Sequence, residues 1–181
     1  EYNKKSRDAL FEAKKSNFFS LMGLSDEGIL ARYYLCLSFE RLIWFIPVLE
    51  KDIKGKPGAI YWKNGECFYW SIAHTENYVA SMFWEYTCGI DIAEYDERDI
   101  SLLSSHKETE YSLLWSRNWK NFYLLWTAKE ALIKKCGTSL EDMARIHLIS
   151  KNETWYSFEF AHKTHTIYTK FDLPIIISYT I

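Results

Sequence analysis

The sequence predicts an α+β fold, in which helices and strands occur in separate groups along the chain. Apolar residues recur at helical spacing in two pairs of segments, and short segments rich in aromatic and β-branched residues follow each pair. No regular alternation of strand and helix is present, which argues against a parallel α/β sheet. The predicted helices are 7–21, 26–46, 106–115 and 117–136.

Two of the predicted helices have recognisable ends. In the second, Ser25 or Asp26 can act as the N-cap, because a short polar side chain accepts a hydrogen bond from the first turn. Pro47 ends that helix, since proline has no backbone N–H for the helical ladder. The last helix stops at Gly137, a residue that readily adopts the left-handed conformation of a C-cap.

The predicted strands lie in two runs. Asn64-Gly65 in the first run is a strong hairpin signal, because both residue types tolerate the positive φ angles of a tight turn. The final run resembles a hairpin or a small meander. Strands are expected at 60–62, 67–72, 79–86, 90–92, 145–149, 154–161, 164–171 and 175–179.

The composition is that of a globular protein and disfavours some partners. Hydrophobic residues make up 48% and charged residues 25% of the chain. The net charge of −2 argues against nucleic-acid binding, which needs a basic surface, and no apolar run approaches bilayer length. We therefore expect no membrane partner. Because the four cysteines lie far apart without zinc spacing, we expect reduced thiols in a cytoplasmic protein.

Glu130 stands at the edge of an apolar helix face. Trp126, Glu130 and Lys134 follow at i, i+4 and i+8, so they lie one above another on the helix. Burial of a lone carboxylate is costly unless a cation offsets it. A second acid, Asp91, lies in a short apolar strand earlier in the chain. Two such acids with lysines beside them suit a divalent metal that carries phosphate oxygens.

Five motifs occur in the order in which they occur in the 4′-phosphopantetheinyl transferases. The chain therefore resembles this family, and more closely its surfactin-synthetase-activating type than its small acyl-carrier-protein synthase type. The motifs are Gly55-Lys56-Pro57 (G-K-P in the family), Trp70-Ser71-Ile72-Ala73-His74-Thr75 (F-N-I-S-H-S), Gly89-Ile90-Asp91-Ile92 (G-I-D-I-E), Glu108-Thr109-Glu110-Tyr111-Ser112 (K-x-E-Y-S) and Trp126 to Lys134 (W-x-x-K-E-x-x-x-K).

The resemblance implies two pseudo-symmetric lobes with the active site in the cleft between them. Residues 1–86 would form the N-terminal lobe, in which the expected first strand is not visible, and 87–181 the C-terminal lobe with the metal site. We expect a monomer. If the first lobe is too short, the alternative is a homo-oligomer whose sites lie between subunits.

The family's reaction transfers the phosphopantetheine arm of coenzyme A to a serine of an acyl or peptidyl carrier protein, with release of adenosine 3′,5′-bisphosphate. Coenzyme A would thus be the co-substrate, and Mg²⁺, or Mn²⁺ in its place, the metal. The residue chemistry agrees, because attack of a hydroxyl on a pyrophosphate requires that the charge on the phosphates be neutralised.

The resemblance also assigns roles to individual residues. Asp91 and Glu130 are the expected metal ligands, and Glu130, or a water beside it, would take the serine proton. Lys134 would stabilise the leaving group as the second catalytic residue. The residues expected to bind coenzyme A are Arg32, Lys56, His74 and Lys129, with His74 on the 3′-phosphate. Glu110 matches a family acid near the active site whose role here stays open.

Two positions depart from the family pattern. The family has an acid two residues after the strand aspartate, and here that position is Ala93, as in the smaller synthase type. Since 91 and 93 share one face of a strand, a water or a phosphate oxygen would fill the place of that ligand. Ala73 replaces the usual serine. These departures favour an alternative, a degenerate non-catalytic protein that binds coenzyme A or a carrier protein.

Ordinary structural interpretations exist as well. Glu130 and Lys134 could be a surface pair worth a few tenths of a kcal/mol, and His74 a structural histidine. The presence of Asp91 beside the helical motif favours the site. The apolar candidates for docking the carrier are Leu102, Leu103, Leu113, Leu114 and Trp115.

Overall fold

The computed structural model describes residues 2–4, 12–13, 26–43, 49, 57–61 and 65–181. These residues form a mixed helix and sheet structure, so the predicted α+β class is confirmed. The chain divides into two compact units, unit 1 at residues 1–88 and unit 2 at residues 89–181. Among the described helices, none has the length and apolar character needed to cross a membrane.

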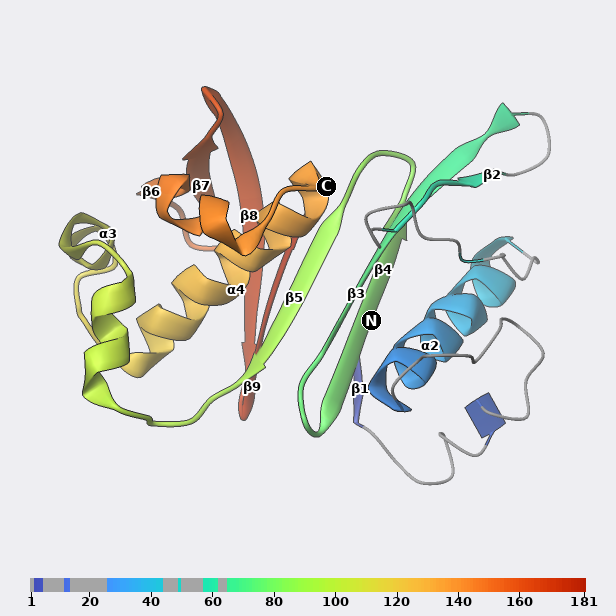
Figure 1. The fold of residues 1–181 in the computed structure, drawn as a ribbon, viewed down its shortest axis with the longest axis horizontal. Helices are drawn as coiled ribbons and strands as arrows, with labels where there is room; N and C mark the ends of the chain where they lie inside the picture. The colour runs from blue at the N-terminus through green and yellow to red at the C-terminus, as the bar shows by residue number, and fades with distance from the viewer. Residues whose placement is uncertain (1, 5–11, 14–25, 44–48, 50–56, 62–64) are drawn as a thin grey trace. The chain divides into compact units, whose positions relative to one another are not determined.

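The described residues of unit 1 form an antiparallel sheet with the long helix α2 packed on it (Figure 1). Helix α2 (Asp26–Ile43) lies against β4 and β3, and acidic residues in its first turn suit the positive end of the helix dipole. The strand order is β1-β4-β3-β2, with β1 (Tyr2–Lys4), β2 (Ile60–Tyr61), β3 (Cys67–His74) and β4 (Tyr78–Trp84).

The core of unit 1 forms where alternate side chains of β3 meet helix α2. Phe68, Trp70 and Ile72 all belong to or pack against the same apolar cluster, since every second residue of a strand faces one side. Phe39 of α2 completes the cluster, and its ring stacks on that of Phe83 at a centroid distance of 3.8 Å.

Unit 2 is a five-stranded antiparallel sheet of order β5-β9-β8-β7-β6. The long helix α4 (Trp119–Cys136) packs against β5, β9 and β8, and the short helix α3 (Glu108–Leu113) packs against β6. The strands are β5 (Gly89–Glu94), β6 (His147–Lys151), β7 (Trp155–Phe160), β8 (Lys163–Asp172) and β9 (Ile175–Thr180).

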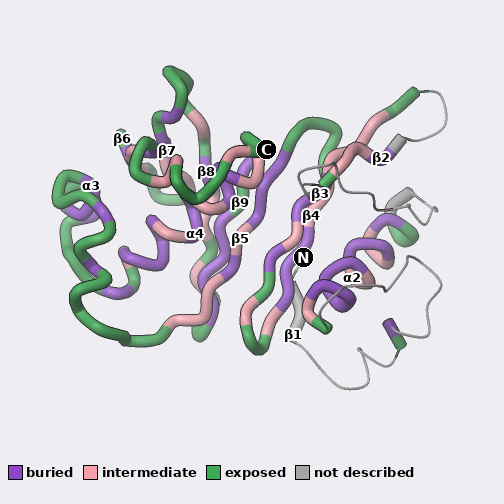
Figure 2. The backbone as a smooth tube through the Cα atoms, viewed as in Figure 1, coloured by how far each residue is buried: buried purple, intermediate pink, exposed green. Residues whose placement is uncertain are grey.

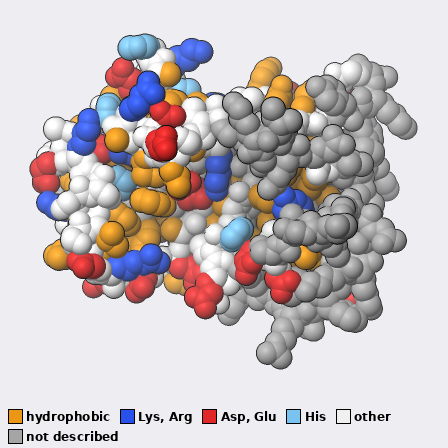
Figure 3. All heavy atoms as spheres, viewed as in Figure 1, with side chains coloured by type: hydrophobic (Ala, Val, Ile, Leu, Met, Phe, Trp, Pro, Cys, Tyr) orange, Lys and Arg blue, Asp and Glu red, His pale blue; other side chains and the backbone are white. Residues whose placement is uncertain are grey.

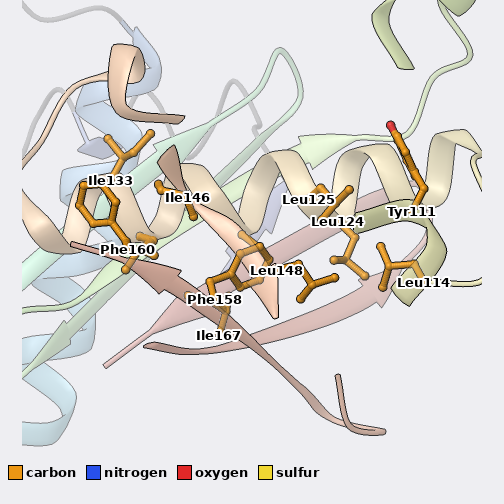
Figure 4. Packing of buried hydrophobic residues seen from close by; sticks show 12 residues of the cluster. Tyr111, Leu114, Leu124, Leu125, Ile133, Ile146, Leu148, Phe158, Phe160 and Ile167 are labelled. Atoms are coloured by element: carbon orange, nitrogen blue, oxygen red, sulfur yellow. The ribbon is translucent and has the colours of Figure 1, made fainter. Parts of the chain in front are cut away.

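The core of unit 2 lies between α4 and the sheet, and Figure 4 shows the side chains that fill it. Helix α4 is buried along most of its length (Figure 2). At its start the Asn118 side chain accepts a hydrogen bond from the N–H of Asn121, and at its end Gly137 closes the helix with φ 66°, as predicted. On the face drawn in Figure 3, charged side chains of both signs are interspersed over unit 2.

The structure differs from the sequence-based expectation at several elements. The first strand that was not visible in the sequence is present as β1, which pairs with β4. A 3₁₀ helix, η2 (Ile100–Ser105), follows β5, and a second one, η3 (Leu140–Arg145), precedes β6. Of the predicted helix 7–21 only residues 12–13 are described, and they are helical. Pro47 and Asn64 lie outside the described residues.

Candidate functional site

Strand β5 approaches helix α4 closely at its first residue, Gly89. A Cβ atom built there would lie 1.9 Å from the carbonyl oxygen of Ala131 and 2.8 Å from the amide nitrogen of Lys135. Both atoms belong to the helix backbone, so no side-chain movement could make room. Glycine is therefore required here, and it brings the acid-bearing strand against the acid-bearing helix.

Asp91, Glu130 and Lys134 meet where this strand and helix touch. The Nζ atom of Lys134 donates hydrogen bonds to Asp91 Oδ1 at 2.7 Å and to the carbonyl oxygen of Ile90 at 3.1 Å. Glu130 lies one helical turn before Lys134 on the same side of α4. The structure thus brings together both predicted metal ligands and the predicted catalytic lysine.

The surroundings of Glu130 disfavour the charged form of its carboxyl. Burial raises the pKa of the Glu130 carboxyl, the negative charge of Asp91 raises it further, and the Lys134 ammonium lowers it only in part. Lys134 instead makes its direct bond to Asp91, whose side chain is 13% exposed. The two carboxylates are therefore near enough for the Asp91 charge to raise the pKa of Glu130, and Lys134 is bonded to Asp91.

The donor set fits a magnesium ion that also binds phosphate. Magnesium in phosphoryl-transfer sites is held by one or two carboxylates and completes its shell with water and substrate oxygens. Asp91 and Glu130 supply two such carboxylates, and an added cation would relieve their repulsion. Within the described part of the chain, no group of three or more His, Cys, Asp or Glu residues could hold a metal ion. The protein's share of such a site is thus this pair, with Ala93 where the family has a third acid.

Lys129 lies on a different face of α4 from Glu130. Its side chain is 3% exposed, and its Nζ atom donates to Glu110 Oε2 at 2.8 Å. Burial lowers the pKa of Lys129 and the Glu110 charge raises it, so the ammonium depends on this partner for its charge. In this structure Lys129 therefore forms a buried ion pair, whereas the sequence predicted a contact with coenzyme A. The physical reason is the position of α3, which places an acid against this face of the helix.

Glu110 accepts hydrogen bonds from three sides. Besides Lys129, its carboxylate accepts from the backbone N–H of Leu148 on β6 at 2.9 Å and from that of Lys107 at 3.2 Å. Burial would raise its pKa, but the Lys129 charge and these donors lower it on balance. Sequence reasoning left this role open, although a charged residue inside an apolar helix pattern is a signal for a buried partner.

Trp126 of the helical motif is a packing residue in this structure. Its ring stacks with Phe122 and lies edge-on to His106, with centroid distances of 6.0 and 6.4 Å. His106 is 5% exposed, and burial, with Lys129 nearby, lowers its pKa to about 4. The imidazole is therefore neutral at pH 7 and forms part of the packing beside the ion pair of Lys129 and Glu110.

The predicted phosphate ligands Arg32 and His74 belong to unit 1. Arg32 is 5% exposed, its Nη1 donates to the Gly28 carbonyl at 2.9 Å, and its guanidinium lies 5.8 Å from the Trp70 ring centroid. Burial lowers the pKa of Arg32, with Cys36 acting in the opposite direction. None of the described acids forms an ion pair with this buried guanidinium.

His74 ends β3 and is exposed. Because Trp70 and His74 are four residues apart on one strand, their side chains point to the same face, which is also the face of Arg32. The sequence analysis also placed Lys56 at the phosphates, but this residue lies outside the described residues.

Two of the apolar docking candidates are core residues. Leu103 and Leu114 are 5% and 7% exposed, so the prediction that they contact a carrier is wrong. Leu102, Leu113 and Trp115 are exposed. Trp115 adopts a φ of 67°, and the Lys151 Nζ lies 3.4 Å from its ring centroid.

One comparison with known proteins finds a match, and it covers the part of the chain that contains Asp91 and Glu130. No curated protein matches the chain. Residues 87–175, which run from the end of unit 1 to the start of β9, match the family model of the 4′-phosphopantetheinyl transferase superfamily. This region contains Asp91, Glu130 and Lys134. Residues 87–175 are therefore a domain of the 4′-phosphopantetheinyl transferase superfamily.

Proposed function

We propose that this protein transfers the 4′-phosphopantetheine arm of coenzyme A to a serine of an acyl or peptidyl carrier protein. The observation that carries the proposal is the meeting of Asp91, Glu130 and Lys134 inside the superfamily domain. An excess of carboxylate charge beside a lysine suits a metal-bound pyrophosphate better than an ordinary surface ion pair.

In this reaction the serine Oγ forms a bond to the phosphorus that carries the pantetheine. The bond from that phosphorus to the bridging oxygen breaks, and adenosine 3′,5′-bisphosphate leaves with the electron pair. The serine proton passes to Glu130 or to a water beside it. Lys134 stabilises the negative charge of the leaving group.

Mg²⁺, or Mn²⁺ in its place, would be held by Asp91 and Glu130 and would neutralise charge on the pyrophosphate. In the structure Lys134 neutralises Asp91 directly. We infer that Lys134 turns from Asp91 to the phosphates when coenzyme A and the metal bind, since its ammonium sits on a flexible four-carbon stem.

We assign the 3′-phosphate of coenzyme A to Arg32 and His74. A guanidinium that is buried without a described acidic partner gains most from an anion, and arginine binds phosphate through two parallel hydrogen bonds. His74 supports this assignment because its strand position directs it to the same face. The roles of Lys56 and of Lys129 at coenzyme A stay predictions.

Transfer of the arm can be tested by weighing the acceptor. The protein would be incubated with an apo carrier protein, coenzyme A and Mg²⁺, and the carrier analysed by intact mass spectrometry. We expect a mass gain of one phosphopantetheine arm, and its loss in Glu130→Gln. Glu141→Gln is the matched control, because Glu141 is an exposed acid on η3.

The same assay separates the enzyme from the non-catalytic alternative. A protein that binds coenzyme A in calorimetry but adds no mass to fatty-acid, polyketide and peptide-synthetase carriers would be a binder only. Equal activity in Glu130→Gln and wild type would reject the site.

A further inference from the structure

A chain of three hydroxyl groups joins helix α4 to the sheet. Thr127 Oγ1 lies 2.7 Å from Ser178 Oγ on β9, and Ser178 Oγ lies 2.8 Å from Thr169 Oγ1 on β8. Thr127 and Ser178 are fully buried. These contacts lie beside the apolar clusters of unit 2, so the buried Ser178 hydroxyl depends on the two threonines for its hydrogen bonds.

The direction of the chain follows from counting protons. Thr127 Oγ1 lies 2.8 Å from the carbonyl oxygen of Tyr123, which can only accept, so the single Thr127 proton goes there. Ser178 must then donate to Thr127, and Thr169 must donate to Ser178. The hydrogen bonds therefore run one way, from β8 through β9 into the backbone of α4.

The chain lies beside the acids of the proposed site. Ser178 is the direct partner of Asp91 in the β5–β9 register, and Thr127 precedes Glu130 by three residues on α4. A separate contact of the same sheet with α4, the close approach of Gly89 on β5 to Ala131, lies one helical turn after Thr127. Apolar contacts alone allow a helix to slide or rotate on a sheet, whereas directed hydrogen bonds between buried groups fix one position.

We propose that Thr127 and Ser178 are positioning residues, which set the rotation of α4 on the sheet so that Glu130 and Lys134 face Asp91. Neither side chain touches the substrate. They act through the helix, and their effect on turnover rests on the proposed function. A misplacement of about 1 Å in such an arrangement costs about a hundredfold in rate.

The test removes the hydroxyls singly and measures both rate and geometry. In Thr127→Val and in Ser178→Ala we expect kcat for arm transfer to fall about ten- to a hundredfold, with little change in KM for coenzyme A. Thr127→Ser keeps the hydroxyl and should restore kcat. Crystal structures of both hydroxyl-free variants should show Lys134 Nζ displaced from Asp91 Oδ1, a contact of 2.7 Å in the parent.

Thr180→Val is the matched control. Thr180 lies on β9 on the same side as Ser178, is fully buried, and donates to the Thr166 carbonyl at 2.8 Å. Its loss should lower the melting temperature about as much as Ser178→Ala does, and leave kcat unchanged.

Two results would overturn the inference: kcat values in Thr127→Val and Ser178→Ala equal to that of Thr180→Val, or an unmoved Lys134–Asp91 contact. If the wild type transfers no arm to any carrier, the proposed function fails. The crystallographic distance then decides the positioning role by itself.

Discussion

The carboxyl of Glu130 occupies a place that disfavours its own charge. Burial and Asp91 raise its pKa, and the Lys134 ammonium, which lowers it only in part, is bonded to Asp91. A folded protein holds such a group at a cost in stability, and that cost is common where a site is prepared for a ligand that has yet to bind.

We therefore expect Glu130→Gln to raise the melting temperature at pH 7 by about 1–3 °C while it abolishes transfer. Because the folded pKa lies above the ordinary value of 4.5, the folded state holds the proton more tightly, and stability falls as pH rises through that window. Glutamine carries no charge at any pH. The gain should accordingly vanish near pH 4, and thermal unfolding followed by circular dichroism at both pH values measures it. A lower melting temperature than wild type at pH 7 would contradict this account.

For Arg32, a role could be predicted from the sequence, but its surroundings in the fold could not. The family resemblance suggested that it binds phosphate, but its burial and its place above Trp70 depend on how α2 packs on β3. For Lys129, the resemblance suggested a contact with coenzyme A. It could not show that α3 would place Glu110 against this lysine, because this contact joins separate elements.

At the scale of elements, the ion pair of Glu110 and Lys129 ties α3 to α4, and the Leu148 bond adds β6. Both side chains are almost fully buried. A buried pair adds little net stability over an apolar pair, but removal of one partner leaves an uncompensated charge.

Glu110→Gln should therefore lower the free energy of unfolding by about 3–5 kcal/mol in urea titrations at pH 7. The pKa of Glu110 is lowered in the folded chain, so its contribution is present above the ordinary value of 4.5 and lost as pH falls below it. Glu108→Gln is the control on the same helix, since its 3.4 Å pair with Arg117 is exposed and worth under about 1 kcal/mol. If Glu110→Gln and Glu108→Gln lowered the free energy of unfolding equally, the buried pair would be no more important than the exposed one.

The contact of β5 with α4 gives a second test at this scale. Gly89→Ala should lower the free energy of unfolding by about 3 kcal/mol or more, because the added methyl meets helix backbone. Hydrogen exchange of the amides of β5 and α4 should rise with it.

Gly65→Ala provides the comparison. It has open space around its Cβ position and a φ of +82°, so only the backbone strain of about 1 kcal/mol applies. An equal cost at the two glycines would show that the close approach at Gly89 is unimportant.

At the scale of the whole molecule, the order of elements was largely predictable, because periodicity and turn residues are local signals. The predicted and observed boundaries of β3 to β9, α3 and α4 differ by one or two residues at most ends. The strand order β5-β9-β8-β7-β6 was not predictable, since it depends on pairings between distant segments such as Asp91 with Ser178. β1 was not predicted because a strand of three residues is too short to show an alternation of apolar and polar side chains.

Interaction with a partner also belongs to this scale. Trp115 is 84% exposed, and its left-handed backbone and the Lys151 contact hold the ring outward. If a carrier docks here, Trp115→Ala should raise KM for the carrier about tenfold and leave KM for coenzyme A unchanged, because exposed aromatic anchors dominate such interfaces. Steady-state kinetics with each substrate varied in turn checks this. Trp84→Ala, which removes an exposed tryptophan of unit 1, is the control.

The two acids proposed for the metal and the buried arginine proposed for the donor are encoded in different halves of the polypeptide. If both proposals hold, the residues for nucleotide recognition and those for group transfer can be varied separately in the gene. Libraries that vary the first half could search for new donors while the ionic chemistry of the second half is left intact.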